Sequence, residues 1–330
     1  FNDAAVQDGR LPLATDLMLQ AGAGSRIWRM NVQWQAVEPS ATGLQAWEQF
    51  DTAYCGALAA GIQPLLQLVN PPCWTLSAGA PCSSPNHEPP ARAHYPALRR
   101  FARSLAARYP DALAIQAGNE PNIHQFWPRP DPAAYTEYLR EVHLGVKSAR
   151  PAMPVVAAGL SGPAATAPAV GDIAAPEFLD AMYRAGASAW MDAVAIHPYP
   201  IVPLTDPRER FHPAMSGLRA TMARNGDAGR RVWVTEVGLA TGPVLGGGAI
   251  TEDDQAATLE AITAELARAA DVEVIVFHTL LQPLAGDTGG SPGFGWVIPA
   301  ANGTFRRSRV YCDFARRLVR PAPGCPGRAS

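Results

Sequence analysis

Residues 113–122, Leu-Ala-Ile-Gln-Ala-Gly-Asn-Glu-Pro-Asn, place a short apolar run directly before a cluster of polar side chains. Leu113 to Ala117 has the length and composition of a buried strand, and the carboxylate of Glu120 follows where that strand ends. The same order recurs along the chain, with a longer amphipathic stretch between one run and the next. This alternation predicts a parallel sheet with crossover helices.

The other apolar runs have the same strand-like length. They are Ile27 to Val32, Ile62 to Val69, Val155 to Ala158, Ala193 to Ile196, Arg231 to Thr235 and Val272 to Phe277, and Phe1-Asn2-Asp3 has the character of the tip of one further, first strand. Helical stretches lie between them at Leu11 to Ala21, Tyr95 to Tyr109, Pro132 to Ala149, Pro176 to Ala185 and Asp253 to Ala269. Many of these stretches open on Pro, Asp or Thr, as helix starts do.

Eight strand–helix units close a (β/α)8 barrel, and we expect residues 1–330 to form one such α/β domain. An open doubly wound sheet is the competing fold, but no glycine-rich nucleotide loop follows an early strand. Long loops are expected at about 71–95 and 280–306, over the mouth of the barrel, with a short tail at 321–330.

Composition excludes several classes of partner. The chain has 330 residues, 48% of them hydrophobic, with 27 Lys and Arg against 29 Asp and Glu. A net charge of -2 gives no electrostatic case for nucleic acid or for an anionic membrane surface. No apolar run reaches the roughly 20 residues that cross a bilayer.

Two pairs of cysteines lie in irregular segments that gain most from a cross-link. We expect disulfides Cys73–Cys82 and Cys312–Cys325, with Cys55 alone in a helical pattern. Disulfides indicate an oxidising compartment, so the sequence predicts a secreted or periplasmic protein whose export signal is not present in this chain. Five free thiols in a cytoplasmic protein are the alternative.

The active site of a barrel lies at the carboxyl ends of its strands, and two carboxylates stand there. Glu120 follows the fourth strand and Glu236 the seventh, in Thr235-Glu236-Val237-Gly238, when residues 1–3 count as the first strand. These strands lie on opposite sides of the barrel, so the two side chains would face each other across its mouth. Retaining glycoside hydrolysis uses two carboxyls about 5–5.5 Å apart.

Asn-Glu-Pro after the fourth strand and Thr-Glu-x-Gly after the seventh resemble the paired signatures of glycoside hydrolase clan A, with families 39 and 5 nearest. The likeness continues in Ile27 to Trp34 followed by Val37-Glu38-Pro39-Ser40, in Gly61 to Leu66, and in Phe294-Gly295-Trp296-Val297 with Asn302-Gly303-Thr304.

The resemblance implies a role for each matching residue. Glu120 matches the acid/base, Glu236 the nucleophile and Asn119 a donor to the sugar 2-hydroxyl. Arg29 matches an arginine that keeps the nucleophile ionised. In His197-Pro198-Tyr199, the tyrosine matches a donor to the nucleophile and the histidine a residue that lines the sugar site.

One departure concerns the last strand, which in the relatives commonly ends in a tryptophan under the central sugar. Here His278 stands in that place, and we expect it to contact substrate. Trp34 and Trp296 are candidates for the missing aromatic surface, with Trp74 and Trp127 as further ones.

The sequence thus predicts a retaining O-glycosidase that needs no metal and no cofactor. A second histidine at ligand spacing from His197 is missing. The substrate is expected to be a β-linked oligo- or polysaccharide or an α-L-arabinofuranoside. A barrel that only binds carbohydrate is the alternative, and the intact catalytic set disfavours it. Fold alone fixes no chemistry. A Schiff-base aldolase is nevertheless disfavoured, because the only lysine of the sequence, Lys147, lies in a predicted helix and not at the end of a strand.

Overall fold

The computed structural model describes residues 1–2, 6, 9–83, 87–162, 170–200, 208–243, 248–283, 293–300 and 303–317. Its centre is a curled parallel sheet that holds the runs predicted from the sequence. In hydrogen-bonded order the strands are β1 (Ile27–Gln33), β2 (Gln63–Val69), β3 (Ala114–Ala117), β4 (Val155–Ala157), β6 (Ala193–His197), β7 (Arg231–Val237) and β10 (Val272–Phe277), with β5 (Leu160–Ser161) paired to β6.

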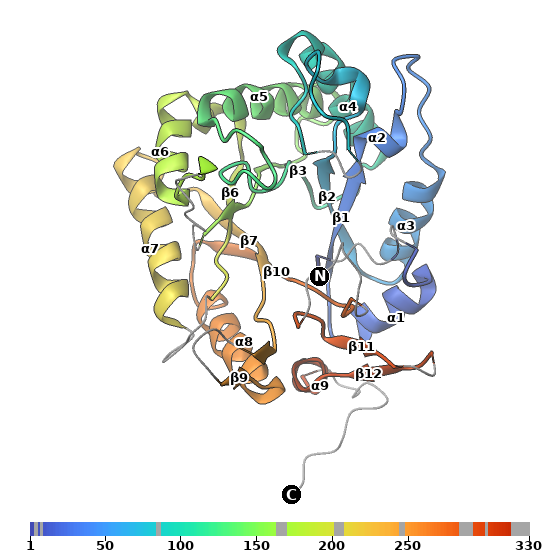
Figure 1. Cartoon of the computed structure of the whole chain (residues 1–330), viewed down its shortest axis with the longest axis vertical. Coiled ribbons are helices and arrows are strands. Elements are labelled where there is room, and N and C mark those ends of the chain that lie inside the picture. The colour runs from blue at the N-terminus through green and yellow to red at the C-terminus, as the bar shows by residue number, and fades with distance from the viewer. Residues whose placement is uncertain are drawn as a thin grey trace, which may run out of the picture.

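Residues 1–2 close this sheet into a barrel. Asn2 pairs in parallel with Arg29 of β1, and its backbone nitrogen donates to the carbonyl oxygen of Phe277 in β10 at 2.8 Å. The first residues therefore lie between the first and last long strands, and Figure 1 shows the N label beside both. The predicted (β/α)8 barrel is confirmed, with Asn2 in the place of the expected first strand, and the doubly wound sheet is wrong.

Helices follow the strands and form a ring outside the sheet (Figure 1). They are α1 (Leu13–Gly22), α3 (Glu48–Ala59), α4 (Tyr95–Arg108), α5 (Pro132–Ala149), α6 (Ala175–Arg184), α7 (Arg208–Arg224) and α8 (Glu252–Leu266), with α9 (Arg309–Ala315) after the barrel. Short pieces are α2 (Trp34–Val37), the turns at Cys73–Thr75, Arg92–His94 and Ala187–Trp190, and the hairpins β8 (Gly242–Pro243) with β9 (Ala249–Ile250) and β11 (Val297–Pro299) with β12 (Phe305–Arg307).

Cap chemistry explains where two of the longest helices begin. Asp131 accepts hydrogen bonds from the backbone of Ala133 and Ala134 at the start of α5, and proline occupies the first helical turn. Thr251 and Asp254 form a reciprocal capping box at the start of α8. Both starts lie within a residue of the sequence prediction.

Successive side chains of each strand point alternately to the outside and the inside of the barrel, and so contribute to two separate hydrophobic cores. One row packs outward against the helices, as Trp28, Met30 and Val32 do in β1. The other row fills the barrel with an apolar floor of Leu65, Ala114, Val156, Ala193, Ala195, Trp233, Val274 and Val276. Further toward the carboxyl ends this inward row becomes polar.

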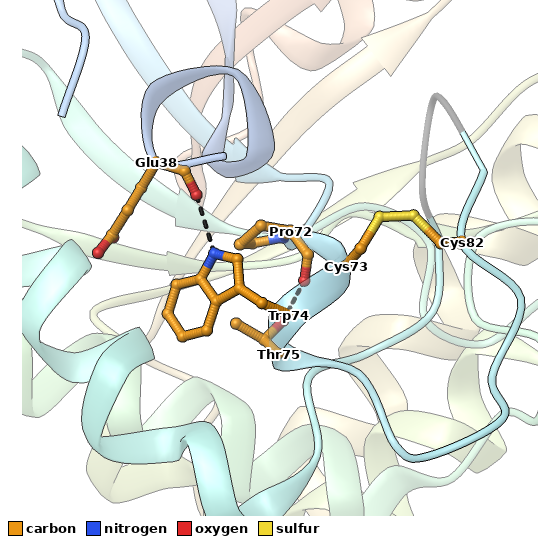
Figure 2. The surroundings of a disulfide bond; sticks show 6 residues. All are labelled: Glu38, Pro72, Cys73, Trp74, Thr75 and Cys82. Atoms are coloured by element: carbon orange, nitrogen blue, oxygen red, sulfur yellow. Dashed lines mark hydrogen bonds between the residues drawn. A yellow bond between two sulfur atoms is a disulfide. The ribbon is translucent and has the colours of Figure 1, made fainter. Parts of the chain in front are cut away.

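The predicted disulfide Cys73–Cys82 is present in the loop after β2, with Cα atoms 5.5 Å apart. Figure 2 shows its surroundings, where the indole nitrogen of Trp74 donates to the carbonyl oxygen of Glu38 at 3.0 Å. Cys55 is a free, exposed thiol. Cys312 is disulfide-bonded, but Cys325 and the tail at 321–330 lie outside the described residues, so the predicted pairing Cys312–Cys325 stays a prediction. None of the helices described here is long and apolar enough to cross a membrane.

Breaking Cys73–Cys82 by a double serine substitution should lower the free energy of unfolding by ~2.5 kcal/mol, because the unfolded chain regains a loop of about ten residues. This corresponds to a drop of about 5 °C in Tm for a chain of this size. Calorimetry with and without reductant measures the effect. Cys55→Ser is the matched control and should leave Tm unchanged; equal Tm values for both variants would contradict the stabilising role.

Candidate active site

A layer of polar side chains crosses the barrel directly above its apolar floor. Gln116 of β3 links three strands: it accepts from Arg29 Nε at 2.6 Å and donates to Thr235 Oγ1 and to the carbonyl oxygen of Ala157, both at 3.1 Å. Arg29 and Gln116 are almost fully buried. Since buried polar groups are costly unless hydrogen-bonded, these bonds fix the side chains in one arrangement.

Glu236 lies on this layer, near the end of β7, and its carboxylate accepts hydrogen bonds from three side chains. Arg29 Nη1 and Asn2 Nδ2 donate to its Oε1 at 2.5 and 2.8 Å, and the Tyr199 hydroxyl donates to its Oε2 at 2.6 Å. The structure thus brings the sequence-predicted Arg29 and Tyr199 to Glu236. Asn2 is an additional partner.

Charge around Glu236 keeps it ionised. Burial alone would raise the pKa of this carboxyl, but the adjacent His197 ring and the charge of Arg29 oppose it, and the pKa falls to about 2. The ionised form therefore adds stability above the ordinary carboxyl pKa, and this contribution is lost as the pH falls toward 2. Burial and the neighbouring Glu236 raise the pKa of Tyr199, so its hydroxyl remains a proton donor.

Glu120 lies opposite, directly after β3, on a backbone turned by Gly118 and by its own positive φ of 35°. Its backbone nitrogen donates to the carbonyl oxygen of Gly159 at 3.1 Å. Its Oε1 is 2.7 Å from His197 Nδ1, and the other ring nitrogen of His197 is 3.0 Å from Thr235 Oγ1. The left-handed conformation is uncommon for residues other than glycine, and here these contacts hold it.

The two carboxylates converge. One oxygen of Glu120, one oxygen of Glu236 and one nitrogen of His197 all lie within 4.8 Å of one another. Three such atoms could hold a metal ion, but each already has a partner: Arg29, Asn2 or Tyr199 for Glu236, His197 for Glu120, and Thr235 for His197. The donor set is therefore arranged for hydrogen bonds and proton exchange.

Asn119 completes the polar layer with its amide oxygen. That oxygen accepts from Arg29 Nη2 at 2.9 Å and from Gln67 Nε2 at 3.0 Å. Because the oxygen already accepts from these two donors, a hydrogen bond from Asn119 to a substrate would come from the amide nitrogen. The side chain is only partly buried.

His278 lies beside the same cluster, at the end of β10. Its ring is 6.2 Å from that of Tyr199 and 5.4 Å from that of Phe294, and Phe294 is 5.7 Å from Tyr199. The bond between His278 and Thr279 is a cis peptide. Phe294, which is partly exposed, supplies an aromatic side chain here. The sequence placed it in a segment that resembles the relatives but did not identify it as a site residue.

Two tryptophans that were predicted to contact substrate, Trp34 and Trp296, lie away from this cluster. Trp34 is fully buried, stacks on Phe101 and donates to Glu38 at 3.0 Å. Trp296 is 1% exposed and packs between Phe277 and Phe314. Neither indole presents a face on which a sugar could stack. Trp34 follows the end of β1 and Trp296 directly precedes β11, but both side chains point into the packing outside the barrel.

Four polar residues of the site were missed: Asn2, Gln67, Gln116 and Thr235. For three of them a signal was present. Gln67, Gln116 and Thr235 each follow an inward apolar residue, Leu65, Ala114 or Trp233, by two positions, and a strand has a period of two. A polar residue at an inward position near a strand end is the pattern that would have found them.

The barrel is similar to solved glycosidase structures. A family 39 glycoside hydrolase from Bacteroides cellulosilyticus WH2 is 19% identical, with a TM-score of 0.67 over 92% of this chain and 60% of that one. A β-xylosidase from Caulobacter crescentus CB15 is 20% identical, with a TM-score of 0.69 over 92% of this chain and 63% of that one. This chain therefore spans less than two thirds of either structure.

An exo-β-1,4-mannosidase from Opitutaceae bacterium strain TAV5 is 17% identical, with a TM-score of 0.61 over 92% of this chain and 54% of that one. No family model and no curated protein matches the sequence. At these identities the likeness concerns the fold alone, and it confirms the expected (β/α)8 barrel.

Gly159→Ala should displace His197, because a Cβ at this position would lie 2.1 Å from His197 Nε2 and 2.6 Å from Thr235 Oγ1. We expect a loss of about 1–3 kcal/mol of stability and a fall of roughly a hundredfold in the rate of any reaction that uses Glu120. Chemical denaturation and kinetics measure the two effects. Gly229→Ala is the control, since no atom lies within 4 Å of its added Cβ; similar values for both variants would speak against the contact.

Proposed function

We propose that the chain is a retaining glycoside hydrolase that cleaves O-glycosidic bonds by double displacement. The observation that carries this proposal is the approach of Glu120 and Glu236, with one oxygen of each within 4.8 Å of the other. Retaining enzymes hold their two carboxyls about 5–5.5 Å apart, whereas inverting enzymes need about 6.5–9.5 Å to admit a water molecule. The glycosidases of similar fold support the same reading.

Glu236 is the nucleophile of this proposal, because its surroundings keep it charged and oriented. In the first step its carboxylate attacks the anomeric carbon, the bond from that carbon to the leaving oxygen breaks, and Glu120 gives its proton to that oxygen. Arg29 and Tyr199 hold the carboxylate in place before the attack. Holding the reacting groups in position supplies much of the rate gain.

Glu120 changes role in the second step. As a carboxylate it takes a proton from water, the water oxygen attacks the anomeric carbon, and Glu236 leaves. His197 suits both states: with Nε2 bonded to Thr235, its Nδ1 can accept from a protonated Glu120 or donate to an ionised one, depending on the tautomer. The Glu120–His197–Thr235 chain therefore supports an acid that becomes a base.

The sugar site is expected to be lined by Asn119, Tyr199 and His278, with Phe294 as its apolar wall, while the predicted contact His197 is fully buried and reaches the site through Glu120. The amide nitrogen of Asn119 would donate to the sugar 2-hydroxyl, an interaction that strengthens in the transition state. Substrates of this proposal are β-linked oligo- or polysaccharides or α-L-arabinofuranosides. Two of the similar structures are a β-xylosidase and an exo-β-1,4-mannosidase, whose names specify β-linked substrates.

The Cys73–Cys82 disulfide fits an oxidising compartment. We infer that the enzyme acts outside the cytoplasm, on carbohydrate that it meets in the periplasm or the surroundings of the cell.

Glu236→Ala should lower turnover of aryl glycosides by at least about 10⁴-fold, because no covalent intermediate can form. A panel of aryl β-xylosides, β-glucosides, β-mannosides and α-L-arabinofuranosides identifies the substrate. Azide should restore turnover of the best one and give a glycosyl azide of inverted configuration. Glu141→Ala, which removes a buried carboxylate bonded to Arg99 outside the site, is the control and should keep its activity. An active Glu236→Ala enzyme would falsify the assignment, and a wild type inactive on the whole panel would favour a carbohydrate-binding barrel.

Glu120→Ala should separate substrates by their leaving groups. Turnover of unactivated glycosides should fall by about 10²–10⁴-fold, whereas a dinitrophenyl glycoside, which leaves without a proton, should be cleaved in the first step at nearly the wild-type rate. Azide should here give a product of retained configuration. Equal losses on both kinds of substrate would remove Glu120 from the acid/base role.

A further inference from the structure

Asn2 is held in the barrel wall by its backbone. It pairs with Arg29 of β1, its nitrogen donates to Phe277 of β10, and the Arg29 nitrogen donates to the carbonyl oxygen of Phe1 at 2.8 Å. Bonds to both neighbouring strands fix where the Asn2 side chain starts and the direction in which it points. The closing position of the barrel thus presents this side chain to the active site.

The amide nitrogen of Asn2 lies between two groups that can accept its hydrogens. It is 2.8 Å from Glu236 Oε1 and 3.4 Å from His278 Nδ1. An ionised carboxylate only accepts, so the amide must turn its nitrogen toward Glu236. A neutral His278 with an unprotonated Nδ1 accepts the second hydrogen and favours the same orientation.

The two oxygens of Glu236 consequently differ. Oε1 accepts from both Arg29 and Asn2, while Oε2 accepts from the Tyr199 hydroxyl and lies 3.8 Å from His197 Nδ1. Since His197 Nδ1 also contacts Glu120, Oε2 is the oxygen on the side of the acid/base. A nucleophilic oxygen needs a lone pair directed at the anomeric carbon, and the oxygen with a single donor keeps one.

We propose that Asn2, supported by His278, is a positioning residue that holds Oε1 of Glu236 and so leaves Oε2 as the attacking oxygen. The inference rests on the proposed function, because it assigns a role in the attack by Glu236. It also gives a reason for the histidine at the end of β10: a tryptophan there would offer no acceptor to the Asn2 amide.

Two substitutions at Asn2 distinguish this role from simple packing. Asn2→Ala removes the donor, and Asn2→Asp keeps the shape but places a second carboxylate beside Glu236. A packing role predicts that Asp is tolerated better than Ala. The positioning role predicts the reverse at neutral pH, because like charges at this distance repel.

The first measurement is the titration of the Glu236 carboxyl, followed by NMR in protein labelled with ¹³C at the glutamate carboxyls, with Glu236→Gln to assign the signal. This readout needs no substrate. Removing a donor to the charged form should move the midpoint upward by roughly one pH unit in Asn2→Ala, and further in Asn2→Asp. Asn225→Ala, which removes an amide that donates to Asp180 at 2.9 Å on the helical surface, is the matched control and should leave the midpoint unchanged.

The second measurement is kinetics on the dinitrophenyl glycoside that the wild type cleaves fastest. Asn2→Ala should lower kcat by about ten- to a hundredfold, with a small change in KM, and should move the acid limb of the pH profile upward with the carboxyl midpoint. Adding His278→Ala to Asn2→Ala should then cost less than His278→Ala alone, because the two side chains act as a unit.

The outcomes separate the two proposals. An active wild type whose Asn2 variants keep both the Glu236 midpoint and kcat would overturn the role of Asn2 and leave the proposed function intact. A wild type that cleaves no glycoside of the panel would overturn the proposed function, and the catalytic role of Asn2 with it, whatever the titration shows. Asn2→Asp that performs better than Asn2→Ala at neutral pH would reduce Asn2 to a packing residue.

Discussion

The positive charge of Arg29 inside the barrel is the constraint around which the site is organised. Burial lowers the pKa of this guanidinium, against the effect of Glu236, and an ion removed from water costs several kcal/mol unless it is paired and fully hydrogen-bonded. Arg29 meets this demand with Gln116, Asn119 and Glu236, which come from two different strands and the turn after one of them. Gln116 and Asn119 in turn have their own partners, so a single buried charge fixes a layer of side chains across the barrel and sets the orientation of the carboxylate.

The barrel and its two catalytic carboxylates could be predicted from the sequence, whereas the side-chain layer around Arg29 could be predicted only in part. The alternation of apolar runs and helices was enough for the barrel, since every strand of the sheet except the two-residue β5 coincides, within two residues at either end, with a run recognised from composition and length. Glu120 and Glu236 could be identified because each stands at the end of such a run. The resemblance then supplied Arg29, Asn119, His197 and Tyr199. The structure brings Arg29, His197 and Tyr199 to the carboxylates, and Asn119 to Arg29.

What could not be predicted depends on which way a side chain points in three dimensions. Trp34 and Trp296 lie next to strands, yet they pack outside the barrel: Trp34 opens the short helix α2, and Trp296 directly precedes β11, so the alternation of a strand says nothing about either side chain. Asn2 belongs to a strand of so few residues that no periodicity can be measured in it. Its place was inferred from the need for an eighth strand, but its contact with Glu236 arises only when β10 and β1 meet.

The closing of the barrel between residue 2 and Phe277 has a consequence for the order of events during synthesis. A ribosome releases the chain from its beginning, so Asn2 is outside long before its partner strand exists. The first long strands can pair and gather their helices earlier, but Glu236 cannot receive the donation of Asn2 until residue 277 has emerged. Contacts of such sequence separation form late. The nascent polypeptide therefore carries Arg29 and Glu120 in an incomplete site until residue 277 has emerged.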